Sequence, residues 1–226
     1  MSSPSTRRLG RPRDRSLPSR RREQILDSAA RVFAERGYPE TDLEVVAARI
    51  GLSKGTIYRY FPSKTALFLA AVDNGMRRLL AAVEVSRDDA QDPLQIIARA
   101  IRAYLEFFDG EPHFAELLIQ ERAQFRDRKK HTYFEYRDAN LGPWRELIGQ
   151  SIASGQLRDV PVDRVVSNLG NLMYGTMFTN RIAGRRQTID QQWRDILDIV
   201  FHGILSEAYR GGHPTLVDQL GLDARR

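Results

Sequence analysis

The chain has 226 residues, of which 42% are hydrophobic, enough for one large or two small globular domains with a packed core. It has no run of the roughly 18 apolar residues that a membrane span needs, and no apolar h-region of a secretory signal near its start. It contains no cysteine, which excludes disulfides and thiol metal ligands and is compatible with a reducing cytoplasm, where we expect the protein.

The formal charge of +6 is concentrated in a leading basic arm, residues 1–18, and in the arginines just after it. Residues 1–22 hold eight arginines and a single aspartate, a net charge of +7, whereas the rest of the chain nets −1. An arm rich in Arg, Ser and Pro cannot bury enough apolar surface to fold alone, but it suits a polyanion such as DNA. The alternative is a solvated tail that aids solubility.

One tripeptide of the arm, Gly-Arg-Pro around Arg11, resembles the core of an AT-hook, with Arg8 and Arg13 as flanking cations. Proline keeps such a segment extended, and glycine permits close approach to the floor of the groove. Arg11 could then lie in a narrow minor groove, where the potential is most negative.

Beyond the arm, nearly every segment has helical period and none has a convincing strand pattern, so we predict an all-α fold. A first helix is expected over residues 19–36. Thr41 and Glu44 have the T-x-x-E spacing of a capping box that opens a second, short helix, and Gly51 can adopt the positive φ that ends it. Ser53 can cap a third, which runs to Tyr58.

A helix, a tight turn and a short second helix is the arrangement that fits the major groove of DNA, so we predict a helix-turn-helix domain over residues 19–66. The second of these helices presents Lys54, Gly55 and Thr56 at its N-terminal end, where recognition helices meet base edges. Lys54 could donate to guanine and the Thr56 methyl could touch a thymine methyl, while Gly55 lets the backbone come close.

Helical patterns continue to about residue 210. Residues 126–140 are mixed in pattern, and the Gly-Gly-His-Pro segment that begins at residue 211 opens a tail, 211–226. Residues 67–210 are therefore expected to form a larger helical body. Its helices are expected at residues 63–86, 93–109, from 112, 144–155, from 161 and 188–209.

The stretch from Ile25 to Val72 resembles the N-terminal domain of the TetR family of transcriptional repressors. The residues that carry the resemblance are Ile25–Tyr38, Thr41, Val46–Ala47, Gly51–Tyr58, Tyr60–Phe61, Ser63–Lys64 and Leu67, at conventional spacing. The resemblance implies a homodimer with two DNA-reading heads and an all-helical body that binds a ligand. It further implies a repressor that binds a pseudo-palindromic operator and is released by a small-molecule effector.

By this resemblance, Tyr58, Tyr60 and Lys64 take phosphates of a double-stranded operator. Either tyrosine could instead pack on the first helix. Where family members have Thr-Thr or Thr-Ser before the second helix, this chain has Thr41-Asp42, and an aspartate is unfavourable beside phosphate. Only Thr41 is therefore expected to contact phosphate at this corner. Further candidates for DNA contact are Ser53 and Arg59.

The resemblance also implies a four-helix dimer interface formed by the last two long helices. A symmetric pair would place its recognition helices about 34–36 Å apart, in successive major grooves. Each apolar stripe could instead face the core of its own subunit. The candidate interface residues are Val165, Leu169, Leu172, Met173, Ile196, Val200 and Ile204.

The body implied by the resemblance is rich in aromatic residues, which suits a pocket for a largely apolar small molecule. Each of these side chains could instead be ordinary core. No cofactor and no membrane partner is expected. The candidate effector-binding residues are Tyr104, Phe108, Phe114, Phe125, Trp144, Asn171, Tyr174 and Phe178.

Two patterns suggest other chemistry. Gly51-x-Ser53-x-Gly55 matches a hydrolase nucleophile elbow, but the elbow needs a strand before the serine, and the preceding residues have helical period. The pairs His113/Glu116 and His131/Glu135 have metal-ligand spacing without a third histidine nearby. We therefore expect neither an enzyme nor a metal site. The remaining alternative is a helical small-molecule-binding protein whose basic arm contacts a partner other than DNA.

Overall fold

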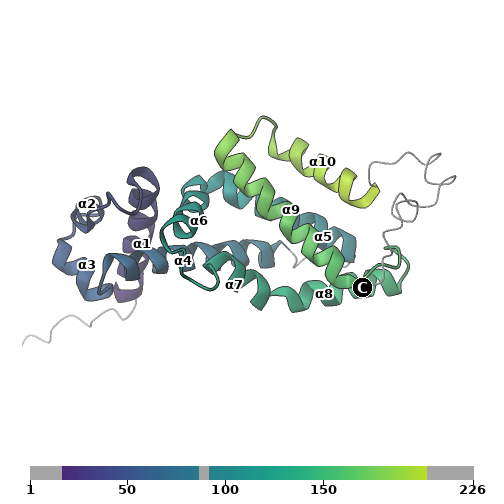
Figure 1. Ribbon diagram of the computed structural model, residues 1–226, viewed down its shortest axis with the longest axis horizontal. Coiled ribbons are helices and arrows are strands. Elements are labelled where there is room, and N and C mark those ends of the chain that lie inside the picture. Colours follow the sequence, from purple (N-terminus) through teal and green to yellow (C-terminus); the bar gives the residue numbers. More distant parts are fainter. Residues whose placement is uncertain (1–16, 87–91, 203–226) are drawn as a thin grey trace, which may run out of the picture. The chain divides into compact units, whose positions relative to one another are not determined.

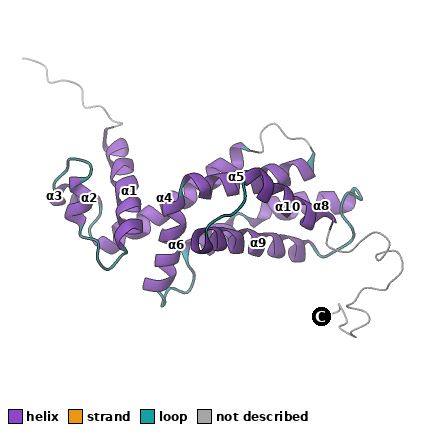
Figure 2. Ribbon diagram, turned by 90° about the horizontal axis from the view of Figure 1, so that it is seen from above, coloured by secondary structure: helices purple, strands orange, loops and turns teal. Residues whose placement is uncertain are grey.

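The computed structural model describes residues 17–86 and 92–202, and within them every regular element is a helix (Figure 1). Figure 2 shows the same helices joined by loops, with no strand in the described part, so the predicted all-α fold is confirmed. No described helix is both long and apolar enough to cross a membrane. The helices are α1 (Leu17–Arg36), α2 (Leu43–Ala48), α3 (Lys54–Tyr60), α4 (Lys64–Val85), α5 (Pro93–Gly110), α6 (Pro112–Gln124), α7 (Thr132–Ala139), α8 (Leu141–Ala153), α9 (Val162–Ala183) and α10 (Ile189–His202).

The chain forms two compact units, and the first is discontinuous in sequence. In the described residues it contains 17–81 and 110–144, while the second contains 82–86, 92–109 and 145–202. The first unit therefore holds the helix-turn-helix segment together with α6 and α7. The predicted functional division, with a DNA-binding part at 19–66 and a body at 67–210, remains a prediction.

Local sequence signals account for most helix starts. Ser63 Oγ accepts a hydrogen bond from the Ala66 amide at 3.0 Å and so caps α4. Pro93 is the first residue of α5 and Pro161 directly precedes α9. Thr188 Oγ1 accepts from the Gln191 amide at 3.2 Å at the start of α10. The segment 126–140, whose pattern is mixed, contains the short helix α7.

The core of the first unit begins with α1, whose apolar face is fully buried. Ile25, Ala29 and Phe33 are each 0% exposed, as the period of this helix predicts. The Ser28 hydroxyl donates to the Val46 carbonyl at 3.0 Å, so a buried polar group ties α1 to α2. This packing gives the short helix α2 a rigid support, because six residues cannot form a stable helix alone.

An aromatic cluster joins the helix-turn-helix segment to α6 within the same unit. Phe68 of α4 lies edge-on to Phe33 at 5.1 Å and stacks with Phe125 at 5.5 Å between ring centroids. Tyr38 contacts Phe125 at 5.1 Å, and its hydroxyl bonds to the Thr65 hydroxyl at 2.8 Å. Gln120 Nε2 also donates to the Phe33 carbonyl at 2.9 Å. Helix α6 is therefore part of the structural support of α1 and α4.

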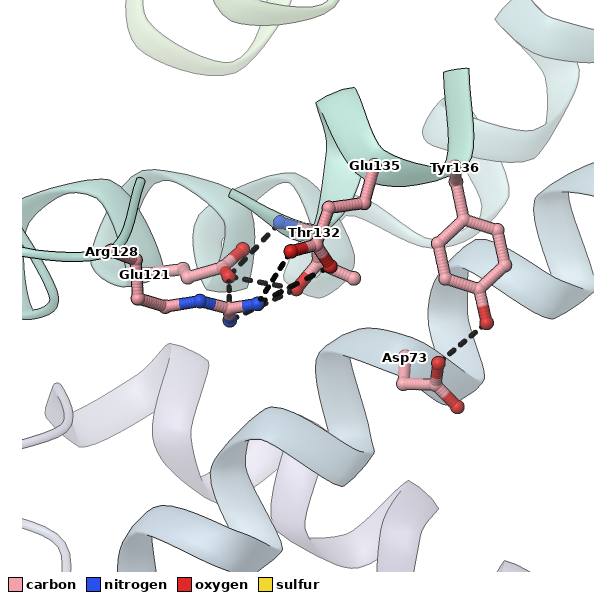
Figure 3. Close-up of polar contacts among 6 residues, drawn as sticks. All are labelled: Asp73, Glu121, Arg128, Thr132, Glu135 and Tyr136. Carbon is pink, nitrogen blue, oxygen red and sulfur yellow. Dashed lines mark hydrogen bonds and ion pairs between the residues drawn. The ribbon is translucent and has the colours of Figure 1, made fainter. Parts of the chain in front are cut away.

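A buried carboxylate organises the connection from α6 to α7 (Figure 3). Glu121 is 0% exposed, and its Oε1 accepts from Arg128 Nη1 at 2.5 Å and from the Thr132 amide and hydroxyl at 3.1 and 2.7 Å. The Tyr136 hydroxyl donates to Asp73 of α4, and burial together with this bond raises the pKa of Tyr136 to about 12. The hydrogen bonds to Glu121 Oε1 thus tie the start of α7 to α6, while Glu121 Oε2 has no hydrogen-bond partner among the described residues.

Polar contacts link α5 to α10 and to the loop before it in the second unit. Trp193 Nε1 donates to the Ala98 carbonyl at 2.8 Å. The Arg102 guanidinium lies 5.2 Å from the Trp193 ring centroid and 2.7 Å from Asp190. Arg185 pairs with Asp109 at 2.5 Å. These contacts fix α10 although none of its described side chains is fully buried.

Candidate nucleic-acid interface

The start of α2 differs from the prediction in its capping residue. Asp42, not Thr41, is the N-cap, and its Oδ1 accepts from the Glu44 amide at 2.9 Å. Thr41 is only 3% exposed, and its hydroxyl donates to the Gly37 carbonyl at 2.7 Å. The predicted Thr41–Glu44 capping box is therefore wrong. The structure also offers no support for a phosphate contact by the Thr41 hydroxyl, because that group points into the protein.

The turn between α2 and α3 depends on a glycine in the left-handed region. Gly51 has φ of +65°, as expected. Its amide donates to the Ala48 carbonyl at 3.1 Å, and the Leu52 amide donates to Ala47 at 2.9 Å. These bonds satisfy the last carbonyls of α2 and redirect the chain within a few residues.

Helix α3 is capped at its start and anchored by one buried face. Ser53 Oγ accepts from the Thr56 amide at 3.2 Å, which confirms the predicted cap. Ile57 is 0% exposed, and Phe61, just after the helix, is 3% exposed. The N-terminal end is left accessible, since Gly55 is exposed and Thr56 is half-buried. A short helix held from behind, with its N-terminal end outward, can enter a major groove.

The side chains expected to contact phosphates differ in their exposure and in their hydrogen bonds. Tyr58 is 46% exposed and Arg59 is exposed, so both side chains are accessible from outside. Tyr60 is half-buried. Lys64 Nζ donates to the carbonyls of Pro39 and Thr41 at 2.9 and 3.1 Å, which fastens the start of α4 to the α1–α2 loop. A phosphate contact by Lys64 would therefore use the third N–H of its ammonium group.

An ion pair joins the capping residue of α2 to the first residue of α3. Lys54 Nζ lies 2.8 Å from Asp42 Oδ1, and the two side chains are 41% and 55% exposed. The Glu44 amide and Lys54 lower the pKa of Asp42, and Asp42 raises the pKa of Lys54. Sequence reasoning missed this pairing, although the replacement of a usual threonine or serine by Asp42 was the signal for it.

Basic residues before the helix-turn-helix segment are only partly described. Arg8, Arg11 and Arg13, which were predicted to contact DNA, lie outside the described residues. The predicted dimer residue Ile204 also lies outside them. Arg22 of α1 is exposed, and its guanidinium lies 5.2 Å from the Phe61 ring centroid. This contact places one cation of the basic segment directly against the end of α3.

The residues predicted to bind an effector are divided between the two compact units. Phe114, Phe125 and Trp144 belong to the first unit. Phe114 is 3% exposed, and Phe125 is part of the aromatic cluster around Phe68. For these two side chains the structure favours the alternative of ordinary core.

The remaining effector candidates belong to the second unit. Tyr104 and Phe108 are each 9% exposed and lie 4.9 Å apart between ring centroids on α5. Tyr174 and Phe178 are half-buried and lie 4.8 Å apart on α9. Asn171 is exposed. The two aromatic pairs of this unit remain the better candidates for an apolar site.

The predicted dimer positions also differ in accessibility. Met173 is 8% exposed and packs within its own chain, which is the alternative reading of this stripe. Leu172 is 39% exposed, and Val165 and Leu169 are half-buried. On α10, Ile196 and Val200 are half-buried, and Ile199, which was not predicted, is 51% exposed. Apolar surface is therefore left on both helices of the single chain.

The described residues give little support to the hydrolase motif or to the metal-ligand pairs noted in the sequence. Ser53 follows helix α2 and caps α3, so a nucleophile elbow, which requires a preceding strand, is not formed. His113 Nε2 pairs with Glu111 at 2.9 Å. Within residues 17–86 and 92–202 no group of three potential metal ligands comes together.

Comparison with known proteins gives a family match for the same segment. Residues 25–71 match the model of the family "Bacterial regulatory proteins, tetR family". The transcriptional activator FasR of Mycolicibacterium smegmatis is 30% identical over 112 residues, which are 49% of this chain and 51% of FasR. The chain thus spans about half the length of that relative.

Other relatives match over most of their length. The transcriptional repressor KstR2 of Mycobacterium tuberculosis H37Rv is 28% identical over 193 residues, 83% of this chain and 94% of KstR2. Among solved structures, FadR from Bacillus subtilis in complex with stearoyl-CoA is similar in fold. It has a TM-score of 0.67 at 20% identity, covering 81% of this chain and 99% of FadR.

Proposed function

We propose that the chain, whose residues 25–71 match the family "Bacterial regulatory proteins, tetR family", is a sequence-specific DNA-binding transcriptional regulator of that family. We expect it to bind a pseudo-palindromic operator as a homodimer and to repress transcription until a small-molecule effector releases it. The observation that supports this proposal best is α3, which has a buried anchor and an accessible N-terminal end.

The base-reading role falls to the first three residues of α3. Lys54 carries an ammonium group that can donate to the O6 and N7 acceptors of guanine. Thr56 offers a methyl group to thymine, and the lack of a side chain at Gly55 lets the helix backbone approach the base pairs. Phosphate contacts by Tyr58, Arg59 and Tyr60 would fix the register of the helix in the groove without reading sequence.

The effector is proposed to act through a difference in affinity between two conformations of the protein. In one conformation the spacing of the two recognition helices matches successive major grooves, and in the other it does not. A ligand that binds more tightly to the second conformation lowers the affinity for the operator. By linkage, the operator lowers the affinity for the ligand by the same factor. The aromatic pairs on α5 and α9 favour a largely apolar molecule. FadR, whose structure holds stearoyl-CoA, offers one precedent on this fold for a ligand with a long apolar chain, attached there to a charged group.

The proposal is tested by selecting a duplex and then removing the reading side chains. Wild-type protein is used to select 30-base-pair duplexes from a randomised library at low salt. The double variant Lys54→Ala/Thr56→Ala should lose about tenfold or more of its preference for the selected duplex over a shuffled one, since each base contact discriminates by roughly 1–3 kcal/mol. Circular dichroism and sedimentation serve as the fold and assembly controls.

Two results would contradict the proposal. If the wild type enriches no sequence, or if its affinity for duplex DNA does not fall with salt, the protein is not a DNA-binding regulator. A helical small-molecule-binding protein whose basic arm serves another partner would then remain. If the double variant keeps full selectivity, α3 is not the reading helix.

A further inference from the structure

The contact between Asp42 and Lys54 places a negative charge beside the proposed base-reading cation. Asp42 Oδ1 accepts from the Glu44 amide at 2.9 Å and lies 2.8 Å from Lys54 Nζ, so two groups hold the carboxylate in place. Lys54 follows the Ser53 cap, and its backbone is therefore fixed as well. The pair is formed by two helix N-termini that pack together, because α2 and α3 contact one another closely.

Neither helix capping nor stability accounts for the charge of Asp42. Asparagine and serine cap helices about as well as aspartate, so the cap on α2 needs an oxygen and not a charge. Exposed ion pairs contribute little to stability, and both side chains of this pair are more than a third exposed. A carboxylate paired with a cation on a surface that meets phosphates also reduces what that cation can contribute to phosphate binding.

We propose that Asp42 is a specificity-determining residue, which holds the Lys54 ammonium for base reading and penalises its use as a phosphate contact. This inference rests on the proposed function. Non-specific binding depends on phosphate neutralisation, and Asp42 already neutralises the ammonium of Lys54, so this side chain contributes little to such binding. A guanine contact is affected less, because the ammonium has three N–H donors and can stay on Asp42 while it donates to the base. Asp42 thereby widens the gap between operator and random DNA.

The test removes the charge of residue 42 and keeps its side-chain oxygen as the cap of α2. Asp42→Asn is compared with wild type on two 30-base-pair duplexes, one selected from a random library by the wild type and one a shuffled version of it. We expect the variant to bind the shuffled duplex about fivefold to tenfold more tightly and with a salt slope steeper by about one. Its affinity for the selected duplex should stay within about twofold, so the specificity ratio falls.

A matched control separates this role from general electrostatics. Glu35 pairs with Arg49 at 2.7 Å in the same unit, with side chains 54% and 43% exposed. Glu35→Gln makes the same change in net charge and should leave the specificity ratio as it is in the wild type. In a Lys54→Met background, Asp42→Asn should no longer change the ratio, since the residue through which it acts is absent.

The possible results separate the role of Asp42 from the proposed DNA-binding function. An unchanged ratio in Asp42→Asn, an equal change in Glu35→Gln, or an effect that persists in the Lys54→Met background would overturn the role of Asp42 while leaving the DNA-binding function intact. Failure of the wild type to select any duplex would instead overturn the proposed function, and this inference with it. Should Asp42→Asn not fold, Asp42→Ser provides the same removal of charge with a capping hydroxyl.

Discussion

His113 lies in the first turn of α6, among charges supplied by three helices of the first unit. Glu111 pairs with both His113 and Arg78, and Arg78 lies 3.6 Å from Asp27 of α1. The imidazole is largely buried, and this burial lowers the pKa of His113 below its usual value of 6.5, although Glu111 acts in the opposite direction. His113 is therefore neutral in the folded protein at pH 7.

This lowered pKa predicts a loss of stability on mild acidification. As pH falls below 6.5, the unfolded chain takes up a proton at this position before the folded chain does, so the free energy of unfolding decreases until the folded pKa is passed. Urea unfolding between pH 7.5 and 5.5 should show a smaller decrease for His113→Gln than for wild type. His202→Gln, at a side chain that is 72% exposed, is the control. An equal pH dependence in wild type and His113→Gln would contradict this account.

Residue types at the reading head were predictable, but their partners were not. Ser53, Gly51 and Ile57 have the cap, turn and core roles that spacing indicates. The spacing of Thr41 and Glu44 could not reveal that Asp42 caps α2, because two adjacent residues satisfy the same local rule and burial decides between them. The pairing of Asp42 with Lys54 depends on how two helices pack, which no local pattern encodes.

At the scale of elements, α4 and α6 approach each other closely at a glycine of α4. Gly75 of α4 faces the ring of Phe114, and a Cβ built on this glycine would lie 2.0 Å from Phe114 Cε2. Phe114 is 3% exposed, so its ring has no solvent to move into. The glycine is thus required by space rather than by backbone conformation.

Substitution at this contact should destabilise the first unit. Gly75→Ala is expected to lower the free energy of unfolding by about 1–3 kcal/mol through overpacking, despite the better helix propensity of alanine. Adding Phe114→Leu should recover part of the loss by making room. Gly149→Ala in α8 has nothing within 4 Å of the new methyl group and should be neutral or stabilising. Equal stability of Gly75→Ala and wild type in urea unfolding would refute the contact.

The sequence predicted where helices form more accurately than it predicted which helices pack against one another. The helix predicted over residues 93–109 is formed, and Ile97, Ile101, Tyr104 and Phe108, which recur at helical spacing along it, are buried. In contrast, the stacking of Phe125 on Phe68, which follows from the packing of α6 within the first unit, was not predictable from the pattern. Periodicity reports which face of a helix is apolar, but not which element covers that face.

At the scale of the whole molecule, the proposed function requires two copies of the chain. Leu172 of α9 and Ile199 of α10 leave apolar surface exposed on the single chain, and such surface suits contact with a second copy. The charge distribution also favours duplex DNA, since residues 1–22 carry a net +7 in a chain that is otherwise nearly neutral. Neither the operator nor the effector can be read from these features, because both depend on molecules outside the chain.

The most direct test of the central claim is the mass of the complex formed with the selected duplex, measured by native mass spectrometry and by sedimentation. The account predicts two chains on one duplex whose enriched sequence is an inverted repeat with half-sites about one helical turn apart. A single chain on the duplex, or no complex even in dilute buffer, would contradict it.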